Sequence, residues 1–137
     1  GMVVPTFVRQ ALAGEPITVF GSGQQRRCFC HVRDVVRALA ELAARDDLYG
    51  EVFNIGSSGE VSILELAKRV KQATQSNSEI VLIPYDEAYG EGFEDMSRRV
   101  PDTAKIKRAL GWQPIACLDE ILTEVIEHEA GRLQAAA

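Results

Sequence analysis

Strand-like segments alternate with helical segments along this chain, and glycine or proline ends most of them. Alternating β-type residues predict four short strands, over Ile17–Phe20, Arg27–Val32, Glu51–Ile55 and Ile80–Ile83. Apolar residues spaced three and four positions apart predict about five helices between and after these strands. This alternation predicts an α/β fold, or a mixed α+β fold for this chain in isolation, with a small sheet of few strands.

The ends of the predicted helices carry specific signals. Val3–Ala13 is followed by Gly14, a common helix stop. Asp34 is expected to cap a second helix, and Ser62 and Glu65 form a capping box at the start of a third. The apolar face expected for the helix after Asp34 consists of Val36, Leu39, Ala40 and Ala43.

Length and composition narrow the class of protein. The 137 residues are enough for one domain, over residues 1–137, with a core of its own. The net charge of −5 argues against nucleic acid as a partner, and no apolar run is long enough to cross a membrane. Three cysteines without a CxxC pair favour a reduced, cytoplasmic protein and no metal site.

The stretch from Gly21 to Asp34 combines a glycine turn, two arginines and a strand-like pattern. Gly21-x-Gly23 is the nearest approach to a dinucleotide fingerprint, but Arg26 stands where its third glycine would be. A Tyr-x-x-x-Lys pair is also absent from the sequence. We therefore expect neither a catalytic residue nor a cofactor site in this chain.

Arg27 is the strongest candidate for a binding residue, because a guanidinium at a loop-to-strand junction suits a ligand phosphate. Arg98 and Arg99 form a second pair at the end of the long acidic segment 85–100, and together with the pair Arg26 and Arg27 they would suit a diphosphate. The alternative is that these arginines form ion pairs with the many nearby acids. The aromatic residues of the segment 85–100 would either flank a ligand ring or pin the loop; they are Tyr85, Tyr89 and Phe93.

Several motifs follow one another in a characteristic order. They are Val4-Pro5-Thr6-Phe7, Ala11-Leu12-Ala13-Gly14, Ile17 through Asp34, Val52-Phe53-Asn54-Ile55-Gly56, Ser62-Ile63-x-Glu65-Leu66-Ala67, Pro101-Asp102 and Leu110-Gly111-Trp112-x-Pro114. The set resembles the C-terminal part of extended short-chain dehydrogenases/reductases, the NAD-dependent nucleotide-sugar epimerases, dehydratases and decarboxylases. Segment 84–102 resembles the UDP-sugar epimerase and decarboxylase branch. Ser22 departs from the family, which commonly has Asp there.

The resemblance implies a Rossmann-type enzyme whose dinucleotide-binding half, with its catalytic Tyr and Lys, has no counterpart here. It implies that Arg27 binds the substrate diphosphate, and that Arg99, with Arg98 as the fallback, supplies a second phosphate contact. The remaining implied substrate-side residues are Val19 and Phe20 near the base, Val4 and Pro5 near the nucleotide, and Gln25.

These expectations define a first hypothesis: a UDP-sugar-binding portion of an NAD-dependent isomerase, dehydratase or decarboxylase, not catalytic alone and weak in binding. NAD is implied for the full-length family only. A second hypothesis is a non-catalytic binding or interaction module derived from that family. An exposed sheet edge also makes a homo-oligomer conceivable.

Overall fold

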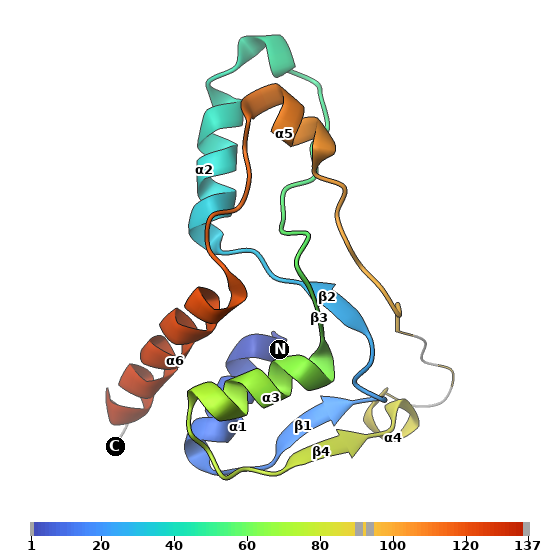
Figure 1. Cartoon of the computed structure of the whole chain (residues 1–137), viewed down its shortest axis with the longest axis vertical. Coiled ribbons are helices and arrows are strands. Elements are labelled where there is room, and N and C mark those ends of the chain that lie inside the picture. The colour runs from blue at the N-terminus through green and yellow to red at the C-terminus, as the bar shows by residue number, and fades with distance from the viewer. Residues whose placement is uncertain (1, 90–91, 93–94, 136–137) are drawn as a thin grey trace. The chain divides into compact units, whose positions relative to one another are not determined.

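The computed structural model describes residues 2–89, 92 and 95–135 (Figure 1). The chain forms two compact units, one of residues 1–27, 61–98 and 122–137 and the other of residues 28–60 and 99–121. The chain passes between these units repeatedly, so neither is one contiguous stretch. The expectation of a single domain over residues 1–137 stays a prediction.

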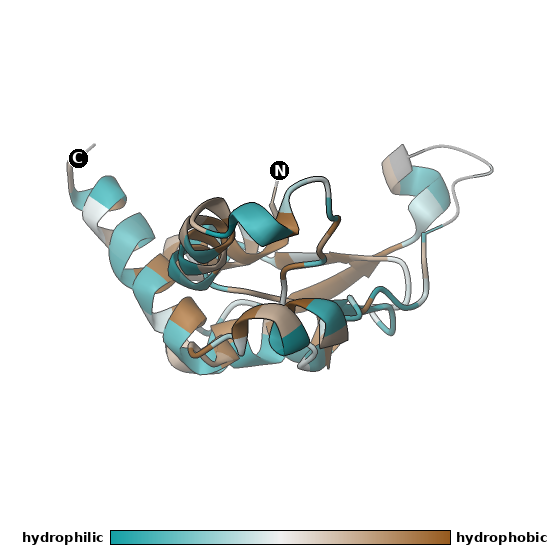
Figure 2. Ribbon diagram, turned by 90° about the horizontal axis from the view of Figure 1, so that it is seen from above, coloured by the Kyte–Doolittle hydropathy of each residue, from teal (hydrophilic) through white to brown (hydrophobic). Residues whose placement is uncertain are grey.

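The first unit is built on a parallel pair of strands. β1 (Ile17–Phe20) runs beside β4 (Ile80–Ile83), with each residue of one strand level with one residue of the other. Helices α1 (Val3–Ala13) and α3 (Ile63–Ala73) pack together and against β1 (Figure 1). Both strands are strongly apolar in Figure 2. The interior of this unit includes Phe7, Val8, Ile17, Val19, Leu66, Ala67, Val70 and Leu122.

The ends of α1 and α3 follow their sequence signals. Gly14 adopts a left-handed φ of 70° and closes α1, a conformation that favours glycine. The Ser62 hydroxyl accepts the backbone N–H of Glu65 at 3.1 Å, so one capping-box hydrogen bond forms as predicted. The predicted helices α1 and α3 and the predicted strands β1 and β4 are confirmed.

The second unit is held by a small cluster around one helix. It contains α2 (Val32–Ala43), a short 3-10 helix η1 (Asp46–Leu48) and α5 (Ala104–Leu110). The cluster centres on Ala38, Ile106 and Trp112, which are almost fully buried. Partly buried side chains complete it, namely Cys30, Leu42, Phe53, Ile55 and Leu110.

The prediction for the start and the buried face of α2 is wrong. His31, not Asp34, caps the helix, and its Nδ1 accepts the backbone N–H of Arg33 at 3.0 Å. Asp34 is buried because its carboxylate accepts the backbone N–H groups of Ile115 and Ala116 at 2.9 and 3.0 Å. Burying Asp34 turns the expected apolar face outward, and its members Val36 and Leu39 are more than half exposed.

Two strand predictions also need correction. Residues Glu51–Ile55 form no strand, because they pair with no other strand among the described residues. The second predicted strand is shorter than expected: β2 covers Arg26–Cys28 and pairs with β3 (Glu60–Ser62). The described residues thus hold four strands, arranged as two separate pairs.

The described residues form six α-helices, whereas the sequence predicts about five. The additional helix, α4 (Tyr85–Tyr89), begins the segment expected to be a loop. The N-cap of α5 is Thr103, while the capping hydrogen bond comes from Asp102, whose Oδ1 accepts the backbone N–H of Ala104 at 2.9 Å. α6 (Leu118–Ala135) is the last helix.

A membrane crossing would need a longer and more apolar helix than any that the described residues form. The described residues likewise bring together no group of three or more His, Cys, Asp or Glu side chains able to hold a metal ion.

Candidate phosphate-binding site

The glycine turn after β1 is shaped by packing against the protein itself. Gly21 and Gly23 have φ values of 68° and 70°, which favour glycine. A Cβ at Gly21 would overlap the ring of Tyr85, and one at Gly23 would come within 2.9 Å of Leu64 and Val19. The turn therefore needs glycine whether or not a ligand is bound.

This turn does not fit a dinucleotide such as NAD. In that fold a glycine turn connects a strand to a helix, whose N-terminus meets the pyrophosphate. Here the turn leads from β1 to the strand β2, and Arg26 replaces the third glycine. The glycine turn between β1 and β2 is therefore not an NAD site of that type.

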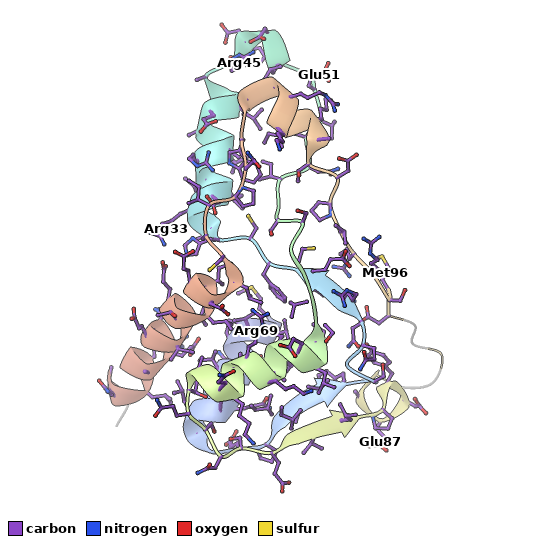
Figure 3. The ribbon with its side chains drawn as sticks, in the orientation of Figure 1. Arg33, Arg45, Glu51, Arg69, Glu87 and Met96 are labelled. Carbon is purple, nitrogen blue, oxygen red and sulfur yellow. The ribbon has the colours of Figure 1, made fainter. Side chains whose placement is uncertain are left out.

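Arg27 is held firmly at the end of the turn by three acceptors. Its Nη1 donates to the backbone carbonyls of Arg26 and Met96 at 2.8 and 2.7 Å, and its Nη2 donates to Asp95 Oδ1 at 2.6 Å. Figure 3 labels Met96 on the segment beside β2. The Arg27 side chain is 15% exposed. The predicted alternative, an ion pair with a nearby acid, is therefore what Arg27 forms.

Arg27 retains hydrogen-bonding capacity in this arrangement. A guanidinium carries five N–H donors. Both donors of Nη1 and one of Nη2 are used, while the Nε–H and the second Nη2–H have no acceptor among the described residues. Two N–H groups of a partly exposed cation are thus available to an anion.

Asp95 was missed by the sequence reasoning. Its second oxygen, Oδ2, accepts the hydroxyl of Tyr85 at 2.9 Å, so one carboxylate bridges Tyr85 and Arg27. Tyr85 was considered only as a ring neighbour or a loop anchor, and the anchor alternative agrees with its place against Gly21. The side chain of Tyr89 and the whole of Phe93 lie outside the described residues. No signal near Asp95 in the sequence indicates that its carboxylate meets Arg27, which lies 68 positions away.

The predicted base-side residues lie along the same turn. Val19 is fully buried in β1, backbone included, whereas Phe20 is 36% exposed. Gln25 is partly buried, and its Nε2 donates to the Phe20 carbonyl at 2.9 Å. The Gln25 carbonyl accepts the N–H of Ile63 at 3.1 Å, so Gln25 also ties the turn to α3.

The other predicted residues are placed less closely around Arg27. Val4 is buried and Pro5 partly buried on α1, so both belong to the packing of that helix. Arg98 is exposed and forms a parallel bridge with Arg26, beside β2. Arg99 is exposed in the second unit, so its convergence with Arg27 stays a prediction.

Two of the motifs singled out in the sequence contact each other in the second unit. Pro101 packs against Gly56, where an added Cβ would come within 3.0 Å of the proline ring. The Asn54 side-chain amide donates to the carbonyl of Asp102 at 3.2 Å. These two contacts fasten the Asn54–Gly56 segment to Pro101 and Asp102, which follow Arg99.

The sequence of this chain is similar to those of known proteins. A family model described as GDP-mannose 4,6 dehydratase matches residues 2–125. A UDP-N-acetyl-alpha-D-glucosaminuronate decarboxylase of Bacillus cytotoxicus is 41% identical over 126 residues, which cover 91% of this chain and 39% of that protein. UDP-glucuronic acid decarboxylase 1 of Danio rerio is 38% identical over 134 residues, covering 98% of this chain and 30% of that protein.

Solved structures with the same fold include two epimerases. One, from Methanothermobacter thermautotrophicus, superposes with a TM-score of 0.86 at 24% identity, over 98% of this chain and 39% of its own. The UDP-glucose 4-epimerase of Thermotoga maritima, solved with UDP-glucose, has a TM-score of 0.78 at 32% identity, over 97% of this chain and 40% of its own. The chain thus spans about 30% to 40% of the length of the relatives it matches.

Proposed function

This chain belongs to the family described as GDP-mannose 4,6 dehydratase, and on that premise we propose that it supplies the nucleotide-sugar-binding side of such an enzyme. The family is that of NAD-dependent nucleotide-sugar epimerases and dehydratases, and the chain corresponds to the C-terminal part of an extended short-chain dehydrogenase/reductase. The ligand proposed is a UDP-sugar, and the proposed contact to its diphosphate is Arg27.

The observation that carries this proposal is the state of Arg27. Its guanidinium is partly buried, fixed by three protein acceptors, and still has two N–H groups available. Holding the cation in place before a ligand arrives reduces the entropy lost on binding. Charge-assisted hydrogen bonds to phosphate oxygens are among the strong ones. An overall charge of −5 makes this local cation the more important for an anionic ligand.

The choice of UDP-sugar rests on the relatives. The two decarboxylases named above are described as acting on UDP-linked uronic acids, and the Thermotoga maritima epimerase was solved with UDP-glucose. Decarboxylation of a UDP-linked uronic acid is the reaction proposed for a full-length form, in preference to epimerisation, because the decarboxylases share the higher identity. NAD would bind to parts that have no counterpart in this chain, so this chain contributes substrate contacts and no catalytic group.

The test is calorimetric titration of the 137-residue chain with UDP-glucose and with UDP. We expect weak binding of both, lowered about tenfold or more in Arg27→Ala, because hydrogen bonds from a charged donor are lost. Arg108→Ala is the matched control, since Arg108 is an exposed arginine of α5 in the second unit. Equal affinity in the wild type and Arg27→Ala would refute the proposal, and absence of binding would favour the non-catalytic interaction module.

A further inference from the structure

We propose that Asp95 is a positioning residue that holds the Arg27 guanidinium in place for the anionic ligand, with Tyr85 in turn holding Asp95. This inference rests on the proposed function, because it concerns how Arg27 meets a diphosphate. It goes beyond that function by giving a role to two residues that do not themselves contact the ligand.

The two oxygens of Asp95 have different hydrogen-bond partners. Oδ1 accepts Nη2 of Arg27 at 2.6 Å, and Oδ2 accepts the hydroxyl of Tyr85 at 2.9 Å. The side chains of Arg27 and Asp95 are 15% and 23% exposed. A pair so far removed from water is screened less than a surface ion pair, so it restrains the guanidinium more strongly.

Tyr85, which holds Asp95, is itself packed tightly against Gly21. The ring of Tyr85 lies so close to Gly21 that a Cβ there would overlap it. Gly21 itself follows β1 and donates its N–H to the carbonyl of Ile83 at 2.7 Å. The order Gly21, Tyr85, Asp95, Arg27 therefore links the sheet to the guanidinium through packed contacts at every step.

Asp95 could in principle compete with the ligand, by occupying the place of the phosphate and leaving when the ligand binds, but its surroundings favour positioning. The residues after Asp95 are fastened to β2: Arg26 donates its N–H to the Ser97 carbonyl at 2.8 Å, Arg26 bridges Arg98, and Arg27 donates to the Met96 carbonyl. Turning the Asp95 carboxylate away would break its hydrogen bonds to Arg27 and Tyr85, and moving its backbone would disturb the contacts of the residues after it. Asp95 is thus a fixed support, and the ligand meets the N–H groups that Asp95 leaves unused.

The test uses three variants and two readouts. Asp95→Ala removes both contacts, Asp95→Asn keeps an acceptor for Arg27 and a polar partner for Tyr85, and Tyr85→Phe removes only the hydroxyl. Glu87→Ala is the control, because it removes an equal charge from an exposed position on the neighbouring helix α4 (Figure 3). The readouts are the guanidinium N–H signals of Arg27 by NMR, without ligand, and the affinity for UDP by calorimetry.

We expect Asp95→Ala to broaden or collapse the resolved Arg27 signals while the backbone spectrum keeps its dispersion, and to weaken UDP binding about tenfold. Asp95→Asn should largely retain the resolved Arg27 signals and the affinity for UDP, and Glu87→Ala should change neither of these readouts. Tyr85→Phe should weaken binding in the wild-type background and add nothing in Asp95→Ala, since it acts through that carboxylate.

Two results would overturn the inference while leaving the proposed function intact. One is an unchanged Arg27 spectrum in Asp95→Ala. The other is unchanged or tighter UDP binding in Asp95→Ala, the result that competition predicts, while Arg27→Ala still loses affinity. If UDP binding does not depend on Arg27 at all, the proposed function fails and this inference falls with it.

Discussion

Replacing Asp34 with alanine is expected to destabilise the second unit by about 3 kcal/mol, because two hydrogen bonds to a charged acceptor are each worth about 1.5 kcal/mol or more. Asp34 is 4% exposed, and its carboxylate accepts the N–H groups of Ile115 and Ala116 at 2.9 and 3.0 Å. Arg37 adds an ion pair at 3.3 Å. Alanine would leave two backbone donors without this acceptor, which is the costly part of the change.

The fluorescence of Trp112 reports directly on unfolding of the second unit. It is the only tryptophan of the chain, it is 1% exposed, and its indole N–H donates to the backbone carbonyl of Asp34 at 3.1 Å. The midpoint of urea denaturation, followed by Trp112 fluorescence, should fall by about 1 to 3 M, given a dependence of roughly 1–3 kcal/mol per molar urea. Asp47→Ala is the matched control, because Asp47 is an exposed acid paired with Arg45; its midpoint should not move. Equal midpoints for Asp34→Ala and Asp47→Ala would refute the reasoning.

The same variant has a pH signature. Burial raises the pKa of Asp34, but hydrogen bonds from the N–H groups of Ala116 and Ile115 and from Arg37 lower it by more, so the pKa lies below its ordinary 3.8. A carboxylate with a lowered folded-state pKa stabilises the fold above its unfolded-state pKa and loses that contribution as the pH falls through the folded-state value. The gap between wild type and Asp34→Ala should therefore be full at neutral pH and narrow below about pH 4. A gap that stays constant down to pH 2 would contradict this account.

Two further predictions concern a glycine and a thiol. Gly21→Ala should lower the free energy of unfolding by about 1–3 kcal/mol, because strain at positive φ adds to overlap with the Tyr85 ring. Gly14→Ala, which has the same sign of φ but open space around it, should lower it by about 1 kcal/mol or less. Equal losses for the two variants in melting experiments would contradict the packing explanation. Burial, helped by the nearby Asp34 charge, raises the pKa of the Cys30 thiol, so at pH 8 iodoacetamide should label the exposed Cys117 first; mass spectrometry showing Cys30 labelled first would contradict this.

Local signals in the sequence predicted those elements whose ends depend on neighbouring residues. Gly14 ends α1 and Ser62 caps α3, because a left-handed glycine and a capping hydroxyl act within one helical turn. The apolar strands Ile17–Phe20 and Ile80–Ile83 were also predicted with their observed bounds. Each could be found because its apolar or capping residues are close together in the chain.

The wrong predictions concern residues whose structure depends on partners far away in the sequence. Asp34 looks like a helix cap, yet it is buried by backbone donors more than 80 positions away, at Ile115 and Ala116. Residues Glu51–Ile55 have a strand-like pattern, but a strand needs a partner and the described chain gives them none. No local pattern reports such partners.

The candidate site divides in the same way. Arg27 was found from its place after a glycine turn and from the resemblance. Asp95, 68 positions further along, was not found, because nothing near it in the sequence indicates that it meets Arg27. The alternative of an ion pair with some acid was considered, and the structure identifies that acid.

The central claim, that Arg27 receives a ligand diphosphate, is tested most directly by comparing the affinities for UDP and uridine in the wild type and in Arg27→Ala. The two ligands differ only in the diphosphate. The account predicts that the wild type binds UDP at least about tenfold more tightly than uridine, and that Arg27→Ala loses this preference while its affinity for uridine is unchanged. An undiminished preference for UDP in Arg27→Ala would contradict the claim.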